Sequence, residues 1–203
     1  MVEVTMDIDS AVDLSNKIVE SARPFCSRAE VAGSVRRRKE NVKDIEIVAQ
    51  VNDWQGLFSV LSAWGEFIKP GVPDILPWAP KEGARYLRMM LTSGVKLDMF
   101  ITSPENWGGI FMMRTGSGVG PDGNAMKGFT PGMFGRWKKV SGGGKMKGGY
   151  PTLPDGRQVI VREEEEFFRL CGVQFIDPVK RLSKSSIKPI KDYKLDIDKF
   201  ETM

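Results

Sequence analysis

Residues 31–51 constrain the fold more than any other part of the chain. The second half of this segment alternates acidic and apolar residues, in the order Asp44, Ile45, Glu46 and Ile47. Successive side chains on a strand point to opposite faces, so the pattern predicts a strand with two carboxylates on one face and two isoleucines on the other. Two neighbouring acids repel each other, which favours a divalent cation held between them by oxygen ligands. A half-exposed strand with a solvated acidic face is the alternative.

A turn suited to phosphate precedes this strand. Gly33 and Ser34 are followed by three arginines at residues 36–38. Glycine permits close backbone approach, and a serine hydroxyl beside a free N–H forms a small cradle for an anion. The forked donors of arginine suit phosphate oxygens. The segment therefore combines a phosphate holder with a metal holder, as handling a magnesium-bound nucleoside triphosphate requires.

The composition bounds the class of protein. A chain of 203 residues with 41% hydrophobic content suits one sizeable domain or two small ones. Neither a bilayer-spanning apolar run nor a signal peptide is visible, so we expect a soluble, cytoplasmic protein that is not secreted and has no membrane partner. Histidine is absent, which excludes serine-histidine triads and histidine metal sites. Cys26 and Cys171 lack metal-ligand spacing, and we expect buried reduced thiols.

The charge of the chain is unevenly distributed. The formal net charge is +4 and the pI is about 9.0, and residues 123–149 carry no acid at all. Such a one-sign stretch is a plausible track for a nucleic-acid backbone, and a solvated basic surface loop is the alternative. The candidate DNA-binding residues are Lys127, Arg136, Lys138, Lys139, Lys145 and Lys147.

The periodicity of apolar residues, together with glycine and proline at turns, predicts the remaining helices and strands. We expect helices over residues 10–22, 54–64 and 103–114, a first strand over 28–32, a loop over 71–80, a hairpin of strands 85–91 and 95–102, and a strand through Val161. In the second hairpin strand, alternation places Lys96, Asp98 and Phe100 on one side. A lone carboxylate on an inner strand is costly without a partner. Asp98 is therefore a functional acid, an aspartate on an edge strand, or an aspartate paired with Lys96.

The motifs resemble a known family. G-S-V-R-R, six residues and D-I-E is similar to the signature of family X DNA polymerases, the group of DNA polymerase beta, which reads G-S-x-R-R, six residues and D-x-D. Glu46 stands where these polymerases usually carry a second aspartate. The resemblance implies that Asp44, Glu46 and Asp98 are catalytic and bind two Mg²⁺ ions, with Mn²⁺ as an alternative. It also implies that the triphosphate is held by Gly33, Ser34 and Arg37.

Two later segments extend the resemblance. Thr115, Gly116 and Ser117 match the end of the family's Y-F-T-G-S, which meets the sugar of the incoming nucleotide, and Met113 and Arg114 stand where the family has tyrosine and phenylalanine. The implied nucleotide-binding residues here are Met113, Arg114, Gly116 and Ser117. Residues 153–181 resemble the end of the thumb subdomain. Within them we interpret the four glutamates at 163–166 as a solvated first helical turn.

Together these features predict an α+β fold. We expect a nucleotidyltransferase palm over residues 1–110, with a mixed or antiparallel sheet and flanking helices, then a small α/β thumb-like subdomain over 111–182. The C-terminal tail over 183–203 is either a packed strap or flexible. An N-terminal lyase domain and helix-hairpin-helix fingers are not expected, a layout similar to that of the smallest viral members of the family.

The resemblance also implies an activity. We expect a monomeric, metal-dependent nucleotidyltransferase that adds a deoxynucleotide from a dNTP to a 3′-hydroxyl of gapped or primer–template DNA, as a small gap-filling polymerase of the repair type. Two alternatives remain open. One is a terminal or RNA-directed transferase acting on another acceptor, and the other is a nucleic-acid-binding module whose catalysis has lapsed.

Overall fold

The chain forms two compact units. The structure, a computed structural model, describes residues 4–69 and 79–203, and it divides into Met1–Thr102 and Ser103–Met203. The boundary expected after residue 110 falls inside a helix, whereas the observed one follows the last strand of the first unit. Nearly all of the loop expected at 71–80 lies outside the described residues. The expected α+β class is confirmed.

The first unit is built on a five-stranded mixed sheet in the order β2-β4-β7-β6-β5. These strands are β2 (Cys26–Val31), β4 (Asp44–Val51), β5 (Gly65–Phe67), β6 (Tyr86–Leu91) and β7 (Lys96–Ile101). The pairing of β4 with β7 is parallel and the other three pairings are antiparallel. A further short antiparallel pair joins β1 (Met6–Asp7) to β3 (Asn41–Val42).

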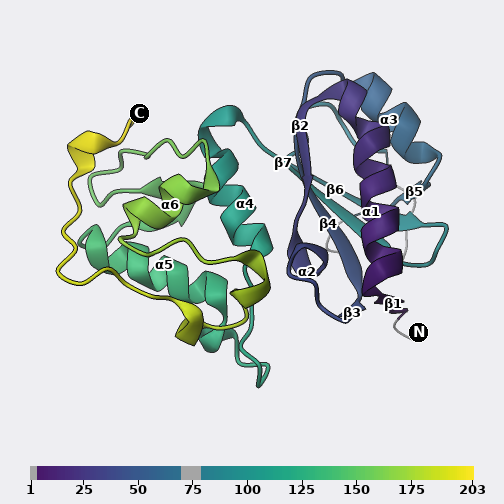
Figure 1. The fold of residues 1–203 in the computed structure, drawn as a ribbon. Coiled ribbons are helices and arrows are strands. Elements are labelled where there is room, and N and C mark those ends of the chain that lie inside the picture. The colour runs from purple at the N-terminus through teal and green to yellow at the C-terminus, as the bar shows by residue number, and fades with distance from the viewer. Residues whose placement is uncertain (1–3, 70–78) are drawn as a thin grey trace. The chain divides into compact units, whose positions relative to one another are not determined.

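Two helices cover one face of the sheet, as Figure 1 shows. They are α1 (Ile8–Ala22), which begins at the N-cap Asp7, and α3 (Trp54–Ser62), which begins at the N-cap Asp53. Their apolar stripes bury Ile18 and Leu57 against the strand residues Ile45, Ile47 and Met99, which are all fully buried. Burial of this face leaves the opposite face of β4 and β7 for the polar residues of the alternating pattern.

The predicted hairpin is confirmed and fixes the register at the polar face. Strands β6 and β7 pair antiparallel, with Arg88 opposite Asp98. The connecting turn ends at Gly94, whose φ of +80° suits glycine. The amide of Gly94 donates to the carbonyl of Leu91 (2.8 Å), and the amide of Leu91 donates to that of Val95 (3.0 Å).

The second unit has its own core. Its helices and strands are α4 (Trp107–Thr115), α5 (Phe129–Val140), α6 (Glu164–Leu170), β8 (Lys145–Lys147) and β9 (Tyr150–Thr152). The core gathers Trp137, Phe167 and Phe168 between the three helices, and all three side chains are buried. The strand expected through Val161 is reduced to isolated bridges, one of which joins Val159 to Thr202.

Short turns and the C-terminal segment complete the chain. The single-turn helices are α2 (Gly33–Arg36), η1 (Arg23–Phe25), η2 (Pro104–Asn106), η3 (Ala125–Lys127), η4 (Pro178–Lys180), η5 (Lys184–Ser186) and η6 (Ile197–Lys199). Of the two alternatives for residues 183–203, a packed strap and a flexible tail, the structure shows the strap. The segment packs against the second core through Ile187, Leu195, Ile197 and Phe200. It is therefore a strap across its own unit rather than a loose end.

Buried groups correct one sequence interpretation and agree with another. The glutamates at 163–166 are not all solvated, because Glu164 is 3% exposed and forms an ion pair with the fully buried Arg181. Both cysteines are buried free thiols, as expected, and burial raises the pKa of the Cys26 thiol to about 11. No helix in residues 4–69 and 79–203 is long and apolar enough to cross a membrane.

Candidate catalytic site

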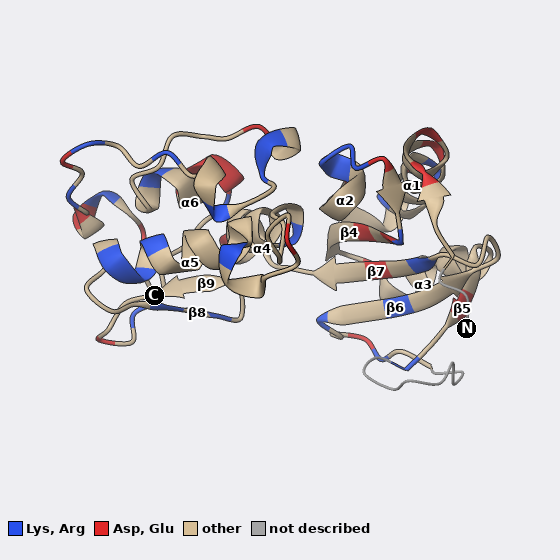
Figure 2. Cartoon of the chain, turned by 90° about the horizontal axis from the view of Figure 1, so that it is seen from below, with Lys and Arg blue, Asp and Glu red and all other residues tan. Residues whose placement is uncertain are grey.

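The sheet register brings the three predicted carboxylates onto one face. Asp44 and Glu46 lie two residues apart on β4, and Glu46 is the register partner of Asp98 on the parallel neighbour β7. Paired strands lie about 4.8 Å apart, so the three residues are near neighbours on this face. In Figure 2 the acidic segments of β4 and β7 lie beside each other, with a basic segment of β6 next to β7.

Asp98 is held by two donors that the sequence analysis did not identify. The guanidinium of Arg88 donates from Nε to Oδ1 and from Nη2 to Oδ2, both at 2.7 Å. The hydroxyl of Tyr86 donates to Oδ1 at 2.6 Å. Asp98 is only 4% exposed, and the fork supplies the partner that a buried carboxylate needs. Counting back from the hairpin turn would have placed Arg88 opposite Asp98.

Electrostatics couple the phosphate turn to the acids. Burial raises the pKa of the Asp44 carboxyl, and the negative charge of Asp98 raises it further. Burial lowers the pKa of the Arg37 guanidinium, while the charges of Glu46 and Asp44 act in the opposite direction. Arg37 therefore lies within the field of both strand carboxylates, as a residue that bridges acids and phosphate would.

The Gly33-Ser34 turn lies directly on β4. The amide of Ala32 donates to the carbonyl of Glu46 at 2.8 Å. Gly33 has a φ of +60°, and a Cβ added there would lie 2.1 Å from Oε2 of Glu46, so only glycine fits. Ser34 is 8% exposed, and in the part of the chain that the structure describes its hydroxyl has no hydrogen-bond partner. A buried donor of this kind is ready for a ligand.

The chain reverses immediately after Arg37. Arg38 has a φ of +56°, and its amide donates to the carbonyl of Val35 at 2.9 Å. Its side chain is 56% exposed and lies 3.9 Å from Asp9. Lys39, which follows, is also exposed. The reversal thus separates Arg37, beside the acids, from cations that face solvent.

The three carboxylates share a face of the sheet but do not form a preorganised metal-binding site. Among residues 4–69 and 79–203, no group of three acidic, histidine or cysteine side chains is placed to hold a metal ion as it stands. The physical reason at Asp98 is plain, because both of its oxygens accept hydrogen bonds from Arg88 and Tyr86. The donor set nevertheless fits a hard cation, since it consists of carboxylate oxygens beside a buried hydroxyl that has no partner within these residues.

The predicted sugar-binding residues lie in the second unit, within a clamped turn. The amide of Ser117 donates to the carbonyl of Arg181 (3.1 Å), and the amide of Thr130 donates to the carbonyl of Ser117 (3.0 Å). A Cβ at Gly116 would lie 2.4 Å from Oγ1 of Thr130, so a larger residue would open the turn. Met113 and Arg114, on the preceding helix, are both half-buried.

The predicted basic track divides into tied and exposed residues. Arg136 donates from Nε to the carbonyl of Cys171 at 2.8 Å, a structural contact. Lys127 is exposed but forms an ion pair with Asp122 at 2.6 Å. The other members are exposed on the last turns of α5 and on β8, where Figure 2 shows basic segments: Lys138, Lys139, Lys145 and Lys147.

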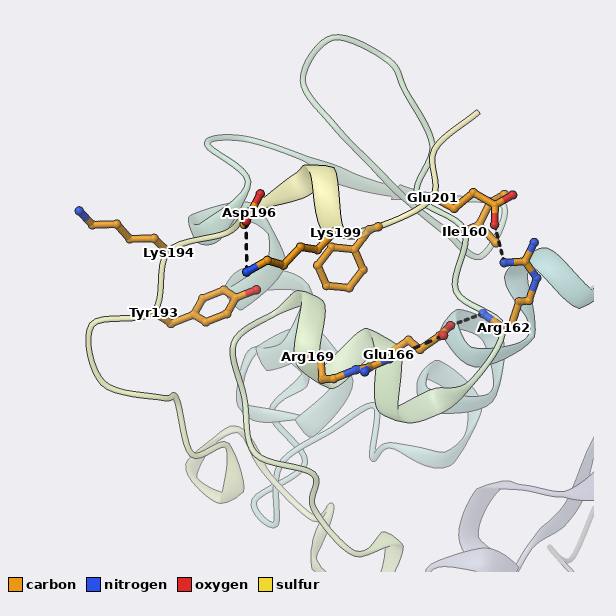
Figure 3. Close-up of a pocket in the computed structure, with 10 residues that line it drawn as sticks. Ile160, Arg162, Glu166, Arg169, Tyr193, Lys194, Asp196, Lys199 and Glu201 are labelled. Atoms are coloured by element: carbon orange, nitrogen blue, oxygen red, sulfur yellow. Dashed lines mark hydrogen bonds and ion pairs between the residues drawn. The ribbon is translucent and has the colours of Figure 1, made fainter.

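A separate pocket of about 450 Å³ lies under the C-terminal strap. Figure 3 shows that several of its charged groups are paired within the protein, with Arg162 bound to Glu201 at 2.7 Å and Lys199 to Asp196 at 3.3 Å. Lys194 points away from the other side chains drawn. Since these ion pairs already satisfy one another, the pocket is a weaker candidate than the acidic sheet face.

Comparison with known proteins does not identify a family for this chain. No protein-family model matches the chain, and no curated protein matches its sequence. The likeness to family X polymerases therefore rests on the residues between Gly33 and Ser117 and on the thumb-like segment.

Proposed function

We propose that this chain is a metal-dependent nucleotidyltransferase that adds a deoxynucleotide from a dNTP to a DNA 3′-hydroxyl, as a small gap-filling polymerase with a palm-like first unit. One observation carries the proposal. The register places Glu46 beside Asp98 and two residues from Asp44, next to a turn whose buried Ser34 hydroxyl has no partner among the described residues.

Each group has a role that follows from its chemistry. Asp44, Glu46 and Asp98 would hold two Mg²⁺ ions, which supply charge neutralisation to the attacking and leaving oxygens. The Ser34 hydroxyl and the Arg37 guanidinium bind the triphosphate, because both donate hydrogen bonds to phosphate oxygens. Arg37 keeps its charge between the phosphate and the acids. Asp98 would serve the primer hydroxyl.

In this proposal, the exposed lysines of the second unit bind the DNA backbone. Lysine ammonium groups neutralise backbone phosphates without reading sequence. Residues 103–203 carry 17 Lys and Arg against 12 Asp and Glu, whereas residues 1–102 carry 13 against 14. The excess of positive charge in the second unit supports a nucleic-acid substrate over a small-molecule acceptor.

The test offers three primers to the full chain with Mg²⁺ and labelled nucleotides. We expect template-matched extension on a gapped duplex. Untemplated addition to a single strand would indicate a terminal transferase, and extension of an RNA primer would indicate an RNA-directed enzyme. Binding of gapped DNA without any extension would indicate a nucleic-acid-binding module without catalytic activity.

Removal of one carboxylate should abolish extension. Losing a ligand that contributes several kcal/mol to the transition state lowers the rate by roughly 1,000-fold or more, which we expect for Asp98→Asn and Asp44→Asn. Glu40→Gln is the matched control, because it removes an exposed carboxylate from the same segment. Single-turnover extension and a melting curve separate chemistry from folding. An Asp98→Asn protein that extends at the parental rate would refute the metal assignment.

A further inference from the structure

The Arg88 fork occupies the two oxygens that a cation at Asp98 would need. Nε and Nη2 of Arg88 contact the two different oxygens of Asp98 at the same distance, 2.7 Å. Tyr86 adds a third hydrogen bond. An inner-sphere cation binds carboxylate oxygens in the same region of their lone pairs, so the fork and the cation compete for one set of acceptors.

We propose that Arg88 is a positioning residue that holds Asp98 in the metal-free protein and yields it to the divalent cation. This inference rests on the proposed function. Asp98 lies between its register partners Glu46 and Arg88, so a cation shared with Glu46 would take an oxygen of Asp98 that the fork now holds. Exchange of one positive partner for another keeps the buried carboxylate neutralised throughout, which a bare aspartate at this position would not be.

The two partners differ in their freedom to move. The side chain of Arg88 is 30% exposed, whereas that of Asp98 is 6% exposed. The guanidinium therefore has a route into solvent, while the carboxylate stays in place. The aromatic ring of Tyr86 lies 5.6 Å from the guanidinium carbon and stacks on Phe100 at 5.1 Å. Arg88 thus moves beside a fixed aromatic wall.

A nearby lysine provides a matched control. Lys96 lies on the same face as Asp98 and is the register partner of Asp44, whose carboxyl pKa its charge lowers. Lys96→Gln and Arg88→Gln each remove one positive charge from this face, but only the second removes the fork. A general effect of charge on metal affinity would therefore appear in both variants, and competition only in one.

The experiment measures Mn²⁺ binding to the full chain by electron paramagnetic resonance. We expect Arg88→Gln to bind Mn²⁺ about tenfold more tightly than the parent, because each charge-assisted hydrogen bond removed from the competing state is worth at least such a factor. We expect Lys96→Gln to change the affinity by less than about threefold. Arg88→Lys, which keeps the charge but not the fork, should also bind more tightly.

A second measurement needs no variant beyond the one that assigns the signal. In the parent, the Nε–H resonance of Arg88, identified by its absence from Arg88→Lys, should shift on titration with Mg²⁺. Two results would refute the exchange of Arg88 for the cation without refuting the proposed metal site. One is a resonance that does not shift with Mg²⁺, and the other is an equal gain in Mn²⁺ affinity in Arg88→Gln and Lys96→Gln. Absence of Mn²⁺ binding from the parent and from Arg88→Gln would overturn both the exchange and the proposed function.

Discussion

Ser34 illustrates how a single side chain separates stability from function. Its hydroxyl is buried and, within the described residues, has no hydrogen-bond partner. An unsatisfied buried polar group costs about 1–3 kcal/mol of folding free energy. Such a group needs an explanation, and contact with a ligand is one that fits the proposed function. The neighbouring Gly33 cannot be replaced without meeting Glu46, so the turn is held close to β4.

Ser34→Ala should therefore raise stability slightly while weakening nucleotide binding. Removing the unsatisfied hydroxyl should leave the melting temperature equal to or above that of the parent. Losing one hydrogen bond to a charged phosphate should raise the KM for dNTP by roughly tenfold or more. Calorimetry and steady-state extension measure the two effects on the same protein. A melting temperature several degrees below that of the parent would mean that the hydroxyl has a structural partner instead.

At this scale the sequence predicted positions better than partners. Alternation placed Asp44 and Glu46 on one face of a strand and Asp98 on a hairpin strand, whereas the adjacency of these two strands was implied only by the resemblance. Arg88 was not predicted because its role depends on register across the hairpin. Glu164 was not singled out because its partner Arg181 lies 17 residues away, and nothing in a run of four glutamates marks one of them as buried.

Among the elements, α6 is anchored by that buried ion pair. Arg181 is fully buried and donates to Glu164 and, from Nε, to the carbonyl of Ile176 at 2.7 Å. Its guanidinium carbon also lies 4.9 Å from the ring centroid of Phe168. The carbonyl of Arg181 in turn accepts from the amide of Ser117. The pair therefore connects the start of α6 to the turn assigned to the nucleotide sugar.

Glu164→Gln should destabilise the second unit severely. Removing one member of a buried pair leaves an uncompensated charge and costs about 3–5 kcal/mol. Glu165→Gln, at the exposed neighbouring position, should change the free energy of unfolding by less than about 0.5 kcal/mol. Urea unfolding followed by tryptophan fluorescence includes this unit, because Trp107 and Trp137 are buried in it, although tryptophans of the first unit contribute to the same signal. Equal effects of the two substitutions would contradict a structural role for the pair.

Elements were predictable where their signals are local. The helix α1 and the β6–β7 hairpin follow from apolar periodicity and from turn residues. The helix α5 was not predicted, because its glycines and proline weaken the helical pattern. The edge strand β5 is only three residues long. Such a short strand forms because it can pair with β6, and the β-propensity of its own residues does not predict it.

On the scale of the whole molecule, charge is divided between the two units. The acids of the candidate site belong to Met1–Thr102, whereas the exposed lysines on α5 and β8 belong to Ser103–Met203. If the chain binds DNA as proposed, the polyanion would be drawn to the second unit and repelled by the bare carboxylates of the first until cations bind. Binding of DNA and binding of metal should therefore be separable by substitution.

Replacement of the β8 lysines should weaken DNA binding without changing the fold. We expect Lys145→Gln with Lys147→Gln to reduce the slope of log affinity against log salt by about 1 for each DNA phosphate that is no longer neutralised. Fluorescence anisotropy with a gapped duplex at several KCl concentrations measures this slope. Lys191→Gln with Lys194→Gln, at exposed positions on the strap, is the control. Equal slopes for both double variants would refute the assignment of the track to β8.

The left-handed residue after Arg37 has a consequence for how ions reach the acids. The backbone turns at Arg38, whose φ is +56°, and Arg38 and Lys39 are exposed whereas Arg37 is half-buried. Mobile salt screens the two exposed cations. Small dications that approach the acids would therefore meet less repulsion from this basic run than they would from a run that is buried throughout.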